Sequence, residues 1–172
     1  MTFFRAIFDI AIAFDRCSLF LPAVLARFGK LWLPVLLWMV VIFSASTDLG
    51  APRHTSRFIR PLLLWLNPHM SEETIERVHH VIRKTAHFVE YALLGILAFR
   101  VTLFDPAFSA SSRGRQLRLA LLFCALYAST DEFHQKFVPT REPAVRDVCL
   151  DTCGSAFGLL AFWSARKCVN HK

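Results

Sequence analysis

The sequence predicts an all-α membrane protein: a bundle of four transmembrane helices preceded by an amphipathic helix. Of its 172 residues, 55% are hydrophobic, and the mean hydropathy of +0.42 is above that of ordinary soluble domains. Long, mainly apolar segments recur along the chain, and the first of them, residues 31–46, carries no charge. The basic residues that give the formal charge of +7 flank these segments and form no aromatic-interleaved patch. The charge therefore indicates membrane topology and not nucleic-acid binding.

Residues 1–30 are expected to form an amphipathic helix at the membrane surface. Phe3, Ile7 and Phe14 fall at helical spacings on one face of this segment. Asp9 interrupts the apolar stretch that a signal peptide would need. We therefore expect the segment to be retained in the mature protein.

A membrane domain is expected over residues 31–166, followed by a short tail over residues 167–172. Its first spanning helix is predicted over residues 31–46, which carry no charge. With a residue or two added at either end, this stretch can cross a hydrocarbon core of about 30 Å at about 1.5 Å per residue. Pro34 is expected in the first turn, where a missing N–H costs little.

The region between the first and second spans predicts a loop, an apolar patch and a helix start. The loop is expected over residues 53–60, and the patch at 61–66 is too short to span, so that it either lies on the surface or re-enters the membrane. Ser71 is followed by two glutamates, a pattern typical of a capped helix N-terminus. The helix that begins there is expected to span the membrane over residues 86–104.

The last two spans flank a polar turn. The third is predicted over residues 117–130, extended in register to Phe137, and the fourth begins near Pro143. Basic residues are concentrated at the N-terminal end, in the connector before the third span and at the C-terminal end. These three regions, including both termini, are therefore expected to be cytoplasmic, and the turn between the last two spans is expected outside.

Polar residues accompany the external ends of all four predicted spans. Ionisable residues are costly near a bilayer, and their convergence on one side favours a site over scattered interface anchors. Gly154 and Gly158 would let a neighbouring helix approach closely, and Pro139 would shape the turn. The candidate site residues are Ser46 in the first span, Lys84, His87 and Tyr91 in the second, Asp131, Glu132 and Gln135 at the end of the third, Arg141 in the turn, and Asp147 and Asp151 in the fourth.

Three separated motifs carry a resemblance to a known family. They are K-x-x-H-F-x-x-Y from Lys84, D-E-x-x-Q-x-F-x-P-x-R from Asp131, and D-x-x-x-D-x-x-G-x-x-x-G from Asp147. On these motifs, over roughly residues 31–162, the sequence resembles the VanZ-like family of bacterial membrane proteins.

Two departures from the family pattern bear on the site. Thr140 stands where the family usually has Gly, and Asp151 stands where it often has Asn. The resemblance implies a multi-pass protein of the bacterial inner membrane. The founding member is associated with low-level resistance to the glycopeptide teicoplanin, so a role in the cell envelope is implied, but resistance itself is not inferred for this chain.

The leading functional hypothesis is binding of an anionic or polyhydroxylated headgroup of an envelope lipid or precursor. Arg141 and Lys84 would hold a phosphate or carboxylate. Gln135, Tyr91 and Ser46 would supply neutral hydrogen bonds. No cofactor and no nucleic-acid partner are expected.

Two alternatives remain open. In an enzyme acting on a lipid headgroup, His87 or Glu132 would be the general base, and Asp131 or Asp147 would orient it. A metal-assisted variant of this enzyme would use His87, His134 and the acids, whose types suit a metal, but their spacing matches no standard signature, and no metal is predicted. In a structural module, the same residues would form a buried ion-pair network. Under the leading hypothesis, the expected internal pairs are Arg141 with Asp131 or Asp147, and His87 with Glu132.

Overall fold

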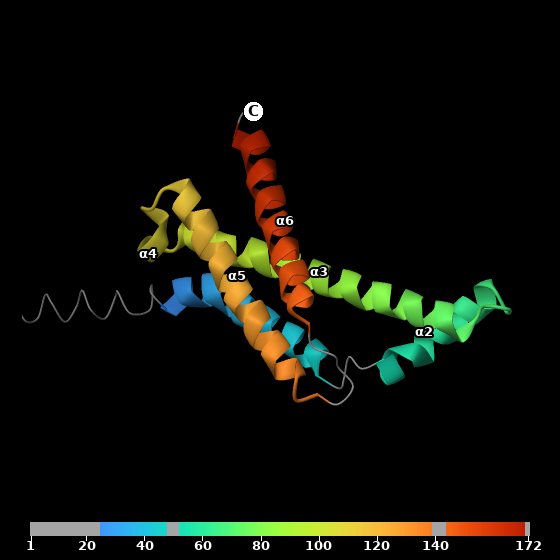
Figure 1. Ribbon diagram of the computed structural model, residues 1–172. Helices are drawn as coiled ribbons and strands as arrows, with labels where there is room; N and C mark the ends of the chain where they lie inside the picture. The colour runs from blue at the N-terminus through green and yellow to red at the C-terminus, as the bar shows by residue number, and fades with distance from the viewer. Residues whose placement is uncertain (1–24, 48–51, 139–143, 171–172) are drawn as a thin grey trace, which may run out of the picture.

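The chain folds as an assembly of helices around one long central helix (Figure 1). The computed structural model describes residues 25–47, 52–138 and 144–170, and it contains no strand within these ranges. Most of the amphipathic segment predicted over residues 1–30 lies outside the described residues. The helices are Leu25–Ser46, α2 (Pro52–Leu66), α3 (Glu72–Phe104), α4 (Pro106–Ser109), α5 (Arg113–Gln135) and α6 (Val145–Asn170).

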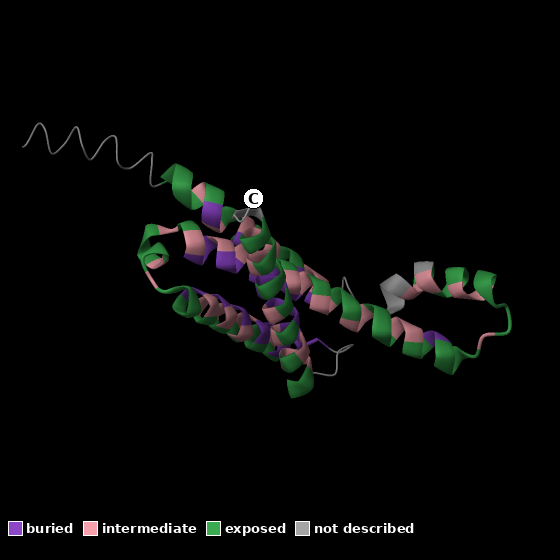
Figure 2. Cartoon of the chain, turned by 90° about the horizontal axis from the view of Figure 1, so that it is seen from above, coloured by how far each residue is buried: buried purple, intermediate pink, exposed green. Residues whose placement is uncertain are grey.

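The central helix is α3, which is 33 residues long. It begins as predicted, because the Ser71 hydroxyl accepts a hydrogen bond from the Thr74 amide at 3.3 Å, and two glutamates occupy the first turn. Both α5 and α6 pack on it, and α2 folds back beside its N-terminal part. Figures 1 and 2 show α2 and the beginning of α3 extending together away from the other helices.

Two expectations about local structure are wrong. The loop expected over residues 53–60 is helical, because these residues belong to α2, which contains Pro61 in its interior. Pro34 does not lie in a first turn, since its helix already runs from Leu25. The apolar patch over residues 61–66 is the C-terminal part of α2, where Leu62, Trp65 and Leu66 are exposed.

Three side-chain hydrogen bonds align the first helix along α3 and α5. Trp32 donates to the Asp105 carboxylate at 2.9 Å, beyond the C-terminal end of α3. Trp38 donates to the Glu90 carbonyl at 2.8 Å, near the middle of α3. The Tyr127 hydroxyl of α5 donates to a carbonyl of the first helix at 2.6 Å. The first helix therefore runs antiparallel to α3, and its end reaches the end of α5.

The helices α3 and α6 touch backbone to backbone. A Cβ atom added to Gly154 would lie 2.5 Å from the Phe88 carbonyl oxygen, and one added to Gly158 would lie 2.0 Å from that of Ala92. Gly95 of α3 is equally close to the backbone of α6, at 2.4 Å from the Ser155 carbonyl oxygen. This approach places the polar beginning of α6 directly beside the middle of α3.

The core surrounds α3, and much of the outer surface is apolar. Tyr91, Leu94 and Phe99 of α3 are fully buried, whereas Leu122 of α5 and Phe157 of α6 are exposed. This outward apolar surface is typical of a protein embedded in lipid. Among the described helices, those long and apolar enough to cross a membrane are Leu25–Ser46, Glu72–Phe104 and Val145–Cys168.

Candidate functional site

A buried hydrogen-bonded triad joins the end of the first helix to the end of α5. The Ser46 hydroxyl donates to Oδ2 of Asp131 at 2.7 Å. Gln135, one helical turn further along α5, donates to the same oxygen at 3.3 Å and lies 3.5 Å from the Ser46 hydroxyl. All three side chains are buried.

An ion pair joins α3 to the beginning of α6. Lys84 pairs with Asp147, and both side chains are about three-quarters buried. The expected pair of His87 with Glu132 does not form. Nδ1 of His87 instead lies 3.8 Å from a carboxylate oxygen of Glu90, one turn along the same helix.

Glu132 caps the entry to α6. Its carboxylate accepts a hydrogen bond from the Ala144 amide at 2.6 Å. This bond ties the end of α5 to the residue that precedes α6.

A small cavity of about 20 Å³ lies at the centre of these residues. It has room for about one water molecule. Six of its lining residues were candidates from the sequence, and two, Arg83 and Leu150, were not. We call the candidate residues around it, together with the triad, the polar cluster: Ser46, Lys84, His87, Asp131, Glu132, Gln135, Asp147 and Asp151.

Tyr91 lies behind the polar cluster, and its buried hydroxyl makes no hydrogen bond with the described residues. Its ring faces that of Tyr127 at 6.2 Å. The Ser155 hydroxyl lies 3.1 Å from the carbonyl oxygens of both Tyr91 and Asp151, which ties this part of α3 to α6. A buried hydroxyl without a partner is a group that a bound water or ligand could satisfy.

Two predicted residues, Arg141 and Pro139, lie outside the described residues. The pairing of Arg141 with Asp131 or Asp147 therefore stays a prediction. Among the described residues, no group of three His, Cys, Asp or Glu side chains is arranged to hold a metal ion.

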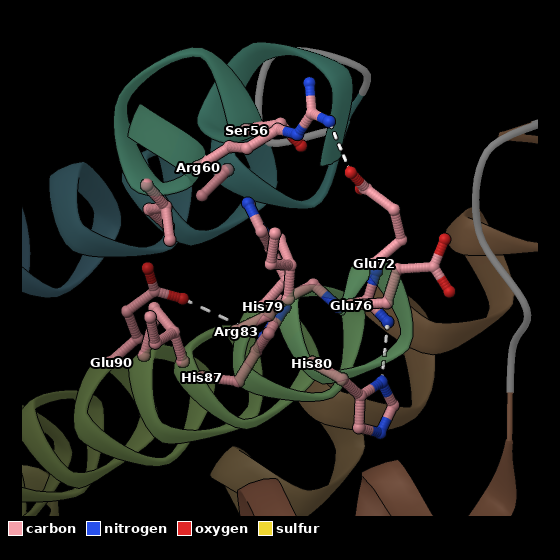
Figure 3. Close-up of a pocket in the computed structure, with 14 residues that line it drawn as sticks. Ser56, Arg60, Glu72, Glu76, His79, His80, Arg83, His87 and Glu90 are labelled. Carbon is pink, nitrogen blue, oxygen red and sulfur yellow. Dashed lines mark hydrogen bonds and ion pairs between the residues drawn. The ribbon is translucent and has the colours of Figure 1, made fainter. Parts of the chain in front are cut away.

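A larger pocket of about 570 Å³ lies between the end of the first helix, α2 and α3 (Figure 3). It shares two lining residues, Arg83 and His87, with the small cavity. An ion pair between Arg60 of α2 and Glu72 of α3 joins the two helices beside it. We call this the α2 pocket.

Sequence reasoning missed the α2 pocket, although a signal was present. His79, Arg83 and His87 are spaced four residues apart and so lie in one stripe along α3. That stripe leads from the α2 pocket to the polar cluster. From the sequence alone, this stripe is interpreted as a face exposed to solvent, because the sequence does not show that α2 folds back over it.

Comparison with protein families identifies the family to which the chain belongs. A family model described as VanZ/LLP1 matches residues 31–166. The chain belongs to the VanZ/LLP1 family. This match covers both the polar cluster and the α2 pocket. Searches of curated proteins and of solved structures found no match.

Proposed function

We propose that this VanZ/LLP1 protein is a multi-pass protein of the bacterial inner membrane whose polar cluster binds the headgroup of a cell-envelope lipid or lipid-linked precursor. The observation that carries this proposal is that α3, α5 and α6 contribute polar side chains to one cavity inside an otherwise apolar assembly, and that Ser46 of the first helix is hydrogen-bonded to the adjoining Asp131. Polar groups in such a setting are costly unless they serve binding, catalysis or assembly. The adjoining α2 pocket supplies the volume that a headgroup needs.

The proposal takes α5 as a fourth span, with both termini in the cytoplasm. Leu122, Leu126 and Phe133 are exposed on α5, while Ala120 and Ala128 are buried in the protein. This distribution suits a helix that faces lipid on one side. Four spans would bring the polar cluster to the external side of the membrane.

Hydrogen bonding would select the headgroup. Buried carboxylates such as Asp131 and Asp151 accept hydrogen bonds from hydroxyl groups. The Tyr91 hydroxyl, which makes no hydrogen bond with the described residues, can donate. Gln135 already donates to Asp131 and Ser46, so a ligand would replace one of these bonds. Lys84 is already paired with Asp147, so an anionic group would have to compete for it. Sugar or polyol headgroups match this set of donors and acceptors.

Native mass spectrometry of the protein extracted from its host membrane tests the proposal. The parent protein should retain a lipid, and Gln135→Ala should lose it while staying folded. Lys136→Ala is the control, because Lys136 is the next residue and is exposed. Retention of the same lipid by Gln135→Ala would contradict headgroup binding. Loss of folding together with binding would favour a purely structural network instead.

A second candidate function is hydrolysis or transfer at the headgroup. Glu132 and His87 line the same cavity, and this favours the second function because a carboxyl and an imidazole so placed can transfer protons to and from a bound group. Incubation of the lipid-bound protein distinguishes the two functions. A time-dependent change in the mass of the retained lipid indicates an enzyme, and a constant mass indicates a binding protein.

A further inference from the structure

We propose that the α2 pocket is a phosphate subsite, which binds the phosphate of a lipid and leaves the hydroxyl-bearing part of the headgroup to the polar cluster. The second half of this statement rests on the proposed function. The phosphate subsite itself does not, because it is built from other residues.

Two donors of the α2 pocket, on Arg83 and His79, lack a carboxylate or carbonyl acceptor among the described residues. Arg83 forms no ion pair with a described residue, and its one hydrogen-bond contact among them is with Nδ1 of His80, at 3.5 Å. The buried Nε2 atom of His79, one turn earlier, has no hydrogen-bond partner in the described part of the chain. A phosphate offers several acceptor oxygens and a negative charge, which match a guanidinium and an imidazole N–H.

Three glutamates also line the pocket, and two of them lie beside basic side chains. Glu72 is paired with Arg60 across the α2–α3 contact. Glu90 lies 3.8 Å from His87. Glu76 is exposed to solvent. Of the two arginines among the described residues that line the pocket, Arg60 is paired with Glu72 and Arg83 forms no ion pair with a described residue.

The remaining walls indicate that the phosphate belongs to a lipid. Ile59 of α2 and Ile75, Ile82 and Ala86 of α3 line the pocket with apolar surface. A volume of about 570 Å³ far exceeds the needs of a phosphate ion and lies within the range of about 300–1,000 Å³ typical of ligand pockets. The glycerol and first methylene groups of a lipid would occupy this apolar part.

The arrangement of the two cavities gives the ligand a direction. Arg83 and His87 line both, so a phosphate held at Arg83 lies next to the polar cluster. A hydroxyl of the group esterified to that phosphate can then enter the small cavity, which has room for about one water molecule, and donate a hydrogen bond to a carboxylate there. Lys84 would not be required for the phosphate, because it is paired with Asp147.

Lipid competition measured by native mass spectrometry tests the phosphate subsite. The probes are phosphatidylglycerol, which has a phosphate and a hydroxyl-bearing headgroup, and galactosyl diacylglycerol, which has hydroxyls but no phosphate. The parent protein should prefer phosphatidylglycerol by about tenfold or more, the factor that corresponds to one charge-assisted hydrogen bond. Arg83→Gln and His79→Phe should each reduce this preference severalfold.

Arg77→Gln is the matched control. Arg77 lies on α3 six residues before Arg83, is exposed, and pairs with Glu73 outside the pocket. It should leave the lipid preference unchanged. An equal loss of preference in Arg77→Gln and Arg83→Gln would overturn the subsite, as would a parent protein that binds both lipids equally. Soluble glycerol 3-phosphate that displaced the lipid at equal concentration would overturn the assignment to a lipid.

The outcomes separate this inference from the proposed function. If Gln135→Ala loses the headgroup lipid and Arg83→Gln keeps the phosphate preference, the polar cluster binds and the subsite is wrong. If Arg83→Gln loses the preference and Gln135→Ala binds normally, the subsite stands and the role of the polar cluster is wrong.

Discussion

The Asp131 carboxylate is buried almost completely, and its surroundings explain why the chain keeps a serine at the end of its first helix. Oδ2 receives donors from Ser46 and Gln135, which come from two different helices. A buried acceptor that loses a donor bears an unpaid desolvation cost. The serine therefore matters for its hydrogen bond and for the contact between helices that this bond maintains.

Replacing Ser46 with Ala should destabilise the protein by about 1–3 kcal/mol, because the buried Asp131 carboxylate loses its shortest described hydrogen bond. Reversible unfolding in mixed micelles would measure the change. Ser44→Ala is the control, since Ser44 only bonds back to the Val40 carbonyl of its own helix at the surface. Equal effects of the two substitutions would show that the hydrogen bond to Asp131 contributes no stability.

The residues of the polar cluster could be predicted from the sequence, but their hydrogen-bond and ion-pair partners could not. Ser46, Lys84, Asp131 and Asp147 could be selected because ionisable and hydroxyl groups interrupt apolar segments at predictable places. Which atom meets which depends on the crossing and rotation of the helices. The sequence therefore suggested His87 with Glu132, whereas the structure has His87 near Glu90 and Glu132 on a backbone amide.

At the scale of the elements, the contact of α3 with α6 fixes the geometry of the site. Three glycines remove the side chains that would hold the two backbones apart. The pair at Gly154 and Gly158 was visible as a spacing of four. Gly95 could not be recognised in the sequence, because its contact with Ser155 depends on how α3 and α6 cross and not on the residues next to it.

Gly158→Ala should weaken the α3–α6 contact by about 1–3 kcal/mol, since the new methyl group would lie 2.0 Å from the Ala92 carbonyl oxygen and the helices would have to separate. The same unfolding measurement applies. Gly114→Ala, in α5 with nothing within 4 Å of its Cβ, should instead be neutral or stabilise by up to about 1 kcal/mol. A neutral Gly158→Ala would mean that the close approach is not needed.

The helix α2 was not predicted from the sequence. Its two prolines and several basic residues read as a loop, and its apolar end is too short for a span. In the structure these residues form one helix whose partner is the beginning of α3. Tertiary packing therefore decided the conformation, and the α2 pocket could not be foreseen without it.

At the scale of the whole molecule, the helical membrane architecture followed from composition and segment length. The number of crossings is harder, because α5 carries arginines at one end and two acids at the other. When the hydropathy of such a helix is averaged over a window of spanning length, the charged ends lower the mean and hide the apolar middle. Its outward-facing leucines are the feature that favours a fourth crossing.

Cysteine labelling would test the four-span arrangement. With all five native cysteines replaced, Lys136→Cys should react with a membrane-impermeant maleimide in intact cells. Ser112→Cys, at the other end of α5, should react only after permeabilisation, and so should a variant that retains only Cys168, which is exposed in α6. Equal labelling of positions 112 and 136 would show that α5 does not cross.

The length of α3 has a consequence for the bilayer around this protein. A helix of 33 residues is about 50 Å long, whereas the first helix, with 22 residues, is about 33 Å long and matches a hydrocarbon core of about 30 Å. The excess in α3 has to be absorbed by tilting or by projection from the membrane, a case of hydrophobic mismatch. For the proposed site, the acyl-chain length of the host lipids therefore sets how deep the polar cluster sits relative to the headgroup plane.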